Sequence, residues 1–206
     1  MRADSRLDAL LEHAGIWRAG NSEGTRFSVI PTGFAALNQR LPGGGWPERG
    51  LIELLLDKPG TCELGLLLPA LVEQQGDRWL MLVAPPHEPY APALAARGID
   101  LERLLVIRTA EVLWTMEQAL NATVCRVVVG WSSEERPARL QWLRRLQLAA
   151  LQAGCLAVLC RPRHAARESS PALLRLELEP ATEGCIVRVI KSRGGPLGSV
   201  CLHFDQ

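Results

Sequence analysis

Between about residues 50 and 160, short apolar runs alternate with longer stretches in which apolar residues recur every three or four positions. The short runs have the length of buried strands, and the longer stretches have the period of amphipathic helices. This alternation is typical of βαβ units, which build a parallel sheet covered by helices. The predicted strands are 51–55, 79–83, 104–107, 126–129 and 156–159. The predicted helices are 63–75, 90–97, 110–122 and 137–153.

The pattern changes after residue 170. Segments 173–179, 185–192 and 199–204 alternate apolar and polar residues and have turn-forming residues, not helices, between them. Such a pattern favours an antiparallel meander with one face on the core. The predicted class is therefore α/β, with a mostly parallel sheet flanked by helices and an antiparallel meander closing one edge.

The N-terminus has a pattern of its own. Ser5-Arg6-Leu7-Asp8 has the spacing of a capping box and predicts a short amphipathic helix that ends at Gly15. A polar linker follows, so we divide the chain into 1–24, helix and linker, and 25–206, the folded domain. The apolar residues of this extension are candidates for self-association or partner binding. They include Leu7, Leu10, Leu11 and Trp17.

Composition narrows the class of protein. The chain has 206 residues, of which 48% are hydrophobic and 22% charged, as in packed globular proteins. A net charge of +1 gives no overall attraction to nucleic acid or anionic membranes. Neither a membrane span nor a signal peptide is present in the pattern, so we expect a cytoplasmic protein.

The six cysteines form no C-x-x-C pair, and most lie in apolar runs. We therefore expect buried, reduced thiols and neither a zinc site nor a disulfide framework. No metal or cofactor is expected. Trp46, in a Gly- and Pro-rich turn, is expected to pack on the domain, whereas Trp17 is as consistent with a partner contact as with packing.

Two motifs precede the first predicted strand: T-G-F-A-A-L-N at 32–38 and P-G-G-G-W-P-E-R-G at 42–50. Together they resemble the entry to the core of RecA and Rad51 proteins, where similar motifs lead into the strand before the phosphate-binding loop. The resemblance extends from about residue 29 to residue 204. It implies a RecA-like core.

The loop after that strand departs from the RecA pattern. A phosphate-binding loop reads G-x-x-x-x-G-K-[ST], because its amides cradle phosphate, the lysine offsets charge and the hydroxyl holds magnesium. Here the lysine is replaced by Cys62 and the hydroxyl by Glu63, while Pro59 removes one amide donor. Lys58 is either a substitute cation or a solvated loop residue. The whole loop reads Leu56, Asp57, Lys58, Pro59, Gly60, Thr61, Cys62 and Glu63.

Two other catalytic positions are also replaced. Pro86 stands where the resemblance places the acid that orients water, and Gly130 stands where it places the magnesium-binding aspartate. We therefore predict that the protein does not hydrolyse ATP, has no catalytic residues and is not an enzyme. A hidden NTP-dependent activity would need a cation in place of Cys62 and an acid in place of Gly130.

A basic segment at 161–170 lies where RecA-like proteins carry a DNA-contacting loop. Arg161, Arg163 and Arg167 are candidates for contact with single-stranded DNA, because phosphate contacts are electrostatic. No aromatic residue is interleaved for base stacking, so an ordinary solvated loop is the other interpretation.

The motif at 42–47, the degenerate loop at 57–60, the Gly130-Trp131 strand end and Arg161-Pro162 resemble the ImuA family of bacterial translesion synthesis. That resemblance implies a non-catalytic, damage-induced adaptor. Its implied partners are the Y-family relative ImuB, an error-prone replicative polymerase paralogue and RecA. The same motifs also resemble SulA, the SOS-induced inhibitor of cell division that binds FtsZ. The N-terminal helix and the complete meander favour ImuA, with SulA as the alternative.

Overall fold

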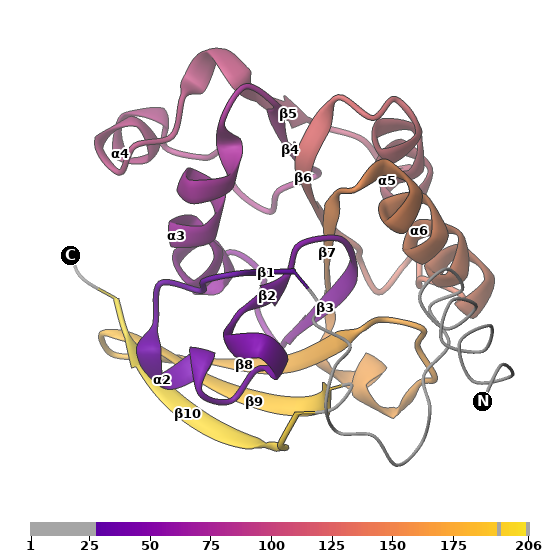
Figure 1. Cartoon of the computed structure of the whole chain (residues 1–206). Helices are drawn as coiled ribbons and strands as arrows, with labels where there is room; N and C mark the ends of the chain where they lie inside the picture. Colours follow the sequence, from indigo (N-terminus) through magenta and orange to yellow (C-terminus); the bar gives the residue numbers. More distant parts are fainter. Residues whose placement is uncertain (1–27, 193–194, 205–206) are drawn as a thin grey trace, which may run out of the picture.

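A computed structural model describes residues 28–192 and 195–204 (Figure 1). Its strands are β1 Val29–Ile30, β2 Trp46–Pro47, β3 Gly50–Leu56, β4 Trp79–Val83, β5 Leu104–Ile107, β6 Cys125–Trp131, β7 Leu156–Pro162, β8 Leu174–Ala181, β9 Gly184–Ser192 and β10 Gly198–His203. Its α-helices are α2 Ala35–Asn38, α3 Glu63–Gln75, α4 Ala91–Ala96, α5 Val112–Asn121 and α6 Leu140–Ala153. Three short 3-10 turns lie at Pro42–Gly44, Leu101–Arg103 and Arg163–Arg167.

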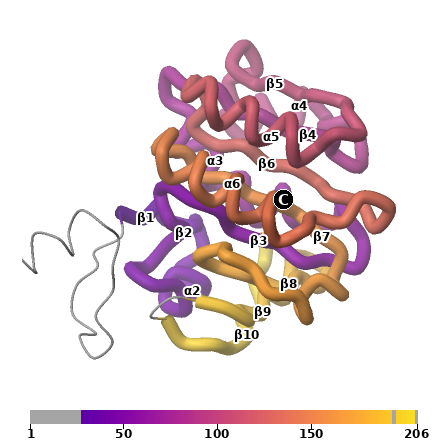
Figure 2. Tube along the Cα trace, turned by 90° about the vertical axis from the view of Figure 1, so that its right-hand side faces the viewer, coloured from indigo at the N-terminus to yellow at the C-terminus, as the bar shows by residue number. Residues whose placement is uncertain are grey.

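Eight strands form the central sheet in the order β10-β9-β8-β3-β7-β6-β4-β5, and β1 and β2 pair separately. Figure 2 shows this order from β5 at the top to β10 at the bottom. Six neighbouring strands, from β8 to β5, run parallel, whereas β9 and β10 are antiparallel. All seven residues of β3 are buried, as expected for a central parallel strand covered on both faces.

Two helical layers cover the parallel strands. Along β3, Ile52 and Leu54 pack into the core beneath α3, whereas Leu51 packs into a second core beneath α5 and α6. This division follows the two-residue period of a strand, which sends successive side chains to opposite faces. In Figure 2 the layer of α5 and α6 faces the viewer. The chain thus has one core on each side of its sheet.

Among the described residues, the C-terminal strands are covered on one face only. Cys185, Val187 and Leu202 are buried in the α3-side core, whereas Ile186 and Cys201 on the opposite face are exposed. This half-covered arrangement is the one that the alternating pattern of an antiparallel meander predicts.

The segment that leads into β3 is held by a local hydrogen bond and by the packing of a tryptophan. The Thr32 hydroxyl donates to Oδ1 of Asn38 at 2.7 Å and so closes the turn before α2. Trp46 is fully buried, which confirms that it packs on the domain. Of the six cysteines, five are buried and Cys201 is exposed.

The prediction of a RecA-like core with a short N-terminal helix needs correction. The described residues form a mixed sheet with five α-helices, and this composition does not single out a RecA-like class. Apolar periodicity locates strands and helices, but it does not determine the family to which a sheet belongs, because many α/β families share it. The predicted segment 1–24, with Leu7, Leu10, Leu11 and Trp17, lies outside the described residues. Among those described, no helix is long and apolar enough to cross a membrane.

Candidate functional site

The loop that follows β3 lies at the carboxyl end of the parallel strands, where α/β proteins commonly bind ligands. It connects the buried strand end at Leu56 to the first turn of α3. Asp57, Lys58, Pro59 and Gly60 are exposed, whereas Cys62 and Glu63 are buried. The end of the loop therefore turns into the core.

The side chain of Glu63 is the centre of this loop. It is only 1% exposed, and its carboxylate accepts hydrogen bonds from the backbone N–H groups of Gly60, Thr61 and Cys62. The N···O distances to Thr61 and Cys62 are both 3.1 Å. A carboxylate at the start of a helix is also stabilised by the helix dipole. Three consecutive backbone amides of the loop therefore form a nest, and the carboxylate of Glu63, the first residue of α3, occupies it.

A fourth donor reaches Glu63 from the other side. Nε1 of Trp131, at the end of β6, donates to Oε1 of Glu63 at 2.8 Å. Trp131 is itself buried, so this hydrogen bond is shielded from water and ties α3 to β6. The residue following Gly130, and not Gly130 itself, is thus the one that completes the site.

This arrangement opposes phosphate binding. In a phosphate-binding loop the amides point at an external anion. Here three of them point at the carboxylate of Glu63. A phosphate approaching the loop would meet a buried negative charge that it would have to displace. Pro59 offers no N–H at all.

The structure brings some of the predicted loop positions together and separates others. A Cβ at Gly60 would lie 2.5 Å from Cδ2 of His87 and 3.1 Å from Cγ of Pro86, so the loop closes tightly on the end of β4. Gly130, in contrast, has its Cα against the thioether of Met116, where no larger side chain fits. It therefore has a packing role on the α5 side of the sheet.

Two buried thiols lie beside the loop. Sγ of Cys62 and Sγ of Cys185 are 3.1 Å apart, joining the start of α3 to β9. The hydrogen bond to Cys62, together with burial, raises the pKa of the Cys185 thiol. Burial likewise raises the pKa of Cys160 well above its ordinary value. A thiol at position 62, where phosphate-binding loops have lysine, thus belongs to the core.

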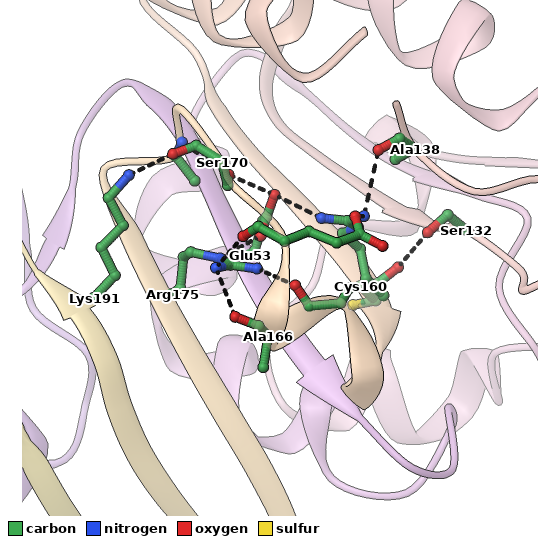
Figure 3. A network of polar contacts seen from close by, with 12 residues as sticks. Glu53, Ser132, Ala138, Cys160, Ala166, Ser170, Arg175 and Lys191 are labelled. Carbon is green, nitrogen blue, oxygen red and sulfur yellow. Dashed lines mark hydrogen bonds and ion pairs between the residues drawn. The ribbon is translucent and has the colours of Figure 1, made fainter. Parts of the chain in front are cut away.

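The basic segment 161–170 was predicted to contact DNA, but its first arginine is buried in the core. Arg161 is 2% exposed, and its guanidinium lies 3.3 Å from the carboxylate of Glu53 and 2.5 Å from that of Glu168. Nε of Arg175 donates to the same Glu53 at 2.6 Å, and the Ser170 hydroxyl donates to it at 2.7 Å (Figure 3). Arg161 is therefore part of the core and cannot reach a phosphate backbone.

The other two arginines are at the surface. Arg163 pairs with Asp57 at 2.8 Å, and this hydrogen bond raises its pKa. Arg167 is exposed, and in the part of the chain that the structure describes it joins no ion pair. The solvated-loop interpretation thus fits this segment better than a phosphate-binding surface.

The remaining chemistry is sparse. A shallow depression beside the loop is lined by Ala84, Pro85, Pro86, His87, Glu88, Arg108 and Thr109. Arg108 and Glu88 pair across it. Within residues 28–192 and 195–204, no group of His, Cys, Asp and Glu side chains is arranged to hold a metal ion.

The chain resembles proteins named SulA. It is 35% identical over 115 residues to the cell division inhibitor SulA of Edwardsiella piscicida, an alignment that covers 53% of this chain and 68% of that protein. The chain belongs to the SulA family. The SulA of Pseudomonas aeruginosa is 37% identical over 101 residues, or 46% of this chain and 62% of that protein. No protein-family model matches the chain.

The crystal structure of SulA from Pseudomonas aeruginosa also matches this SulA-family chain. It has 28% sequence identity and a TM-score of 0.45, and the match covers 54% of this chain and 97% of that one.

SulA-family membership corrects the ImuA interpretation. The translesion function was wrong, as were the partners that it implied, namely ImuB, the polymerase paralogue and RecA. The RecA-like class is likewise replaced by the SulA family. Short motifs such as Gly130-Trp131 and Arg161-Pro162 resemble both families and do not separate them. The additional segments at the two ends favour ImuA, but the sequence identity over 115 residues overturns that interpretation.

Proposed function

We propose that this protein is a non-enzymatic inhibitor of cell division that acts in the cytoplasm by binding FtsZ. The observation that carries the proposal is its sequence identity to two proteins named as the cell division inhibitor SulA. Because the alignments cover about half of this chain, the activity of the whole protein is part of the proposal and not of the comparison.

The geometry of the loop supports an inhibitor that works without nucleotide. Glu63 occupies the amide nest from within, and Trp131 holds it there. The amides of Gly60, Thr61 and Cys62 are thus already bonded to Glu63 and not available to a triphosphate, so we infer that the action of this protein on a partner rests on surface contact. The absence of catalytic residues is part of the same proposal.

A polymerisation assay tests the function directly. Purified FtsZ from the same source is mixed with GTP and increasing amounts of this protein, and polymer is measured by light scattering and sedimentation. We expect polymer to fall as the protein approaches FtsZ in concentration, and size-exclusion chromatography to show a complex. Normal polymerisation with no complex, next to an unrelated protein of similar size as control, would refute the proposal.

Thermal melting tests independence from nucleotide. A ligand that binds only the folded state raises the melting temperature as its concentration exceeds Kd. We expect no shift with millimolar ATP or GTP and magnesium, because Glu63 already fills the nest. A concentration-dependent shift that disappears in Lys58→Ala would show that Lys58 acts as the substitute cation and would contradict this part of the proposal.

A further inference from the structure

Helix α6 has an exposed stripe that its neighbours do not cover. Leu140, Arg144, Leu148 and Leu151 follow one another at spacings of three or four residues and so share one side of the helix. All four are exposed, and Leu148 retains 60% of its accessible surface. Three leucines that share one exposed side of a helix form an apolar patch, and contiguous exposed apolar patches can mark interaction sites.

The stripe is distinct from both faces that α6 already uses. Leu143, Leu146 and Ala150 are buried against the sheet. On the flank toward α5, Arg145 pairs with Glu117 at 2.6 Å and stacks 4.4 Å from the ring of Trp142. At about 100° per residue, Leu140, Arg144 and Leu151 lie roughly 100–140° around the helix from Arg145, and Leu148 lies about 60° from it. Most of the stripe is therefore turned away from α5.

The helix that carries the stripe has positive but no negative side chains. Helix α6 contains two arginines and no acidic residue. Arg145 has its partner in Glu117, whereas Arg144 forms no ion pair with any described residue. A segment that covers the stripe should therefore be apolar on one face and acidic beside it.

The chain enters the described fold close to this helix. The carbonyl of Ser28 accepts from the N–H of Glu48, and two residues later Gly50 donates to the carbonyl of Cys155, just after the end of α6. A Cβ at Gly50 would lie 3.4 Å from Nε2 of Gln147 on α6. Residues 1–27 therefore precede a point beside the second half of α6.

The N-terminal sequence has the complementary chemistry. Leu7, Leu10, Leu11 and Ala14 repeat at helical spacing, and the charged residues between positions 7 and 14 are Asp8 and Glu12. The fourteen residues from Ala14 to Ser28 can extend about 45 Å at roughly 3.3 Å per residue. The stripe is about 17 Å long at 1.5 Å per residue. The segment can reach any part of it.

We propose that residues 7–14 bind in cis to the stripe of α6. In this arrangement Leu7, Leu10 and Leu11 cover Leu148 and Leu151, while Asp8 and Glu12 lie near Arg144. The contact is driven by apolar burial and oriented by charge.

Hydrogen–deuterium exchange of the full chain tests the proposal. We expect the amides of residues 8–15 to exchange at least tenfold more slowly than in an isolated peptide of the same sequence. Leu148→Asp and Leu11→Asp should each remove that protection. Leu197→Asp is the matched control, because Leu197 is 63% exposed and lies outside α6. Because Leu148 and Leu197 are both at the surface, neither substitution should unfold the domain, which circular dichroism checks.

A charge exchange tests the orientation. Arg144→Glu should reduce the protection of residues 8–15, and combining it with Asp8→Lys and Glu12→Lys should restore it. Three outcomes would overturn the proposal. They are no protection in the full chain, protection that survives Leu148→Asp, and protection that is lost on dilution, which would show binding to a second copy instead.

Discussion

Two buried carboxylates, ten residues apart in the sequence, are stabilised in different ways. Glu63 accepts its hydrogen bonds from three amides within three residues and from one indole. Glu53 is paired with two arginines that are 108 and 122 residues away. Glu63 thus stabilises the conformation of one loop, whereas Glu53 connects β3, β7 and β8 across the sheet.

The difference lies in what remains after each carboxylate is removed. Without Glu63, the loop amides can turn toward water, because residues 57–61 are exposed. Without Glu53, two guanidinium groups remain inside the core with a positive charge and too few partners. Removing one member of a buried ion pair costs more than the pair itself contributed, because the other charge stays desolvated. We therefore expect these two sites to respond very differently to substitution.

The largest effect is expected for Glu53→Ala. It should lower the free energy of unfolding by about 3–5 kcal/mol, because Arg161 and Arg175 would be left as unbalanced buried charges. Urea denaturation followed by circular dichroism measures the change. Glu168→Gln is the control, since Glu168 also pairs with Arg161 but is 44% exposed. A loss for Glu53→Ala no larger than that of the control would mean that Glu53 is not the centre of the network.

Glu63→Ala should have an intermediate effect, roughly 1–3 kcal/mol, because the hydrogen bonds of the loop and of the Trp131 indole are lost while the loop can hydrate. The control is Glu73→Ala, an exposed residue on the same helix. Amide exchange at Gly60, Thr61 and Cys62 should become faster in Glu63→Ala alone. Unchanged exchange there would contradict the assignment of Glu63 as the acceptor.

Trp131→Phe isolates one contact of the Glu63 site. It keeps an aromatic ring in the core but removes the indole N–H, so we expect a loss of about 1 kcal/mol. In Glu63→Ala the same substitution should cost less, because the hydrogen bond is already absent. A double-mutant cycle measures this coupling. Additive losses would show that the indole and the carboxylate do not interact.

The smallest expected effect is on the stability of the fold at acid pH. Hydrogen bonds from Ser28 and Arg126 lower the pKa of Glu48 below its usual 4.5. A carboxyl group whose pKa is lower in the folded state stabilises the fold above its unfolded pKa, and that contribution is lost as pH falls through the folded value. We expect Glu48→Gln to reduce stability slightly at pH 7 and to flatten the fall in stability below about pH 4.5. A difference from the parent protein that persists unchanged at pH 2 would contradict this linkage.

Sequence periodicity predicted the elements well where packing and pattern agree. The helix predicted at 63–75 matches α3, and the strand predicted at 51–55 is one residue shorter than β3 at each end. The helix predicted from 137 begins later, at Leu140, because Arg139 is extended. Residues near Pro137 continue the apolar spacing without helical backbone, and spacing alone does not reveal where a helix begins.

The sequence alone determined the alternation of strands and helices, the one-sided meander and the lack of a G-x-x-x-x-G-K-[ST] motif in the loop after β3. These features follow from local periodicity and from the chemistry of single positions. Only the tertiary structure decided that Glu63 turns into the loop and meets Trp131, and that Arg161 points inward to Glu53. Those contacts join residues 68 and 108 positions apart, and a side chain's burial depends on which strands become neighbours. The sequence pattern at Arg161 is that of a basic loop, and the sheet makes the same residue part of the core.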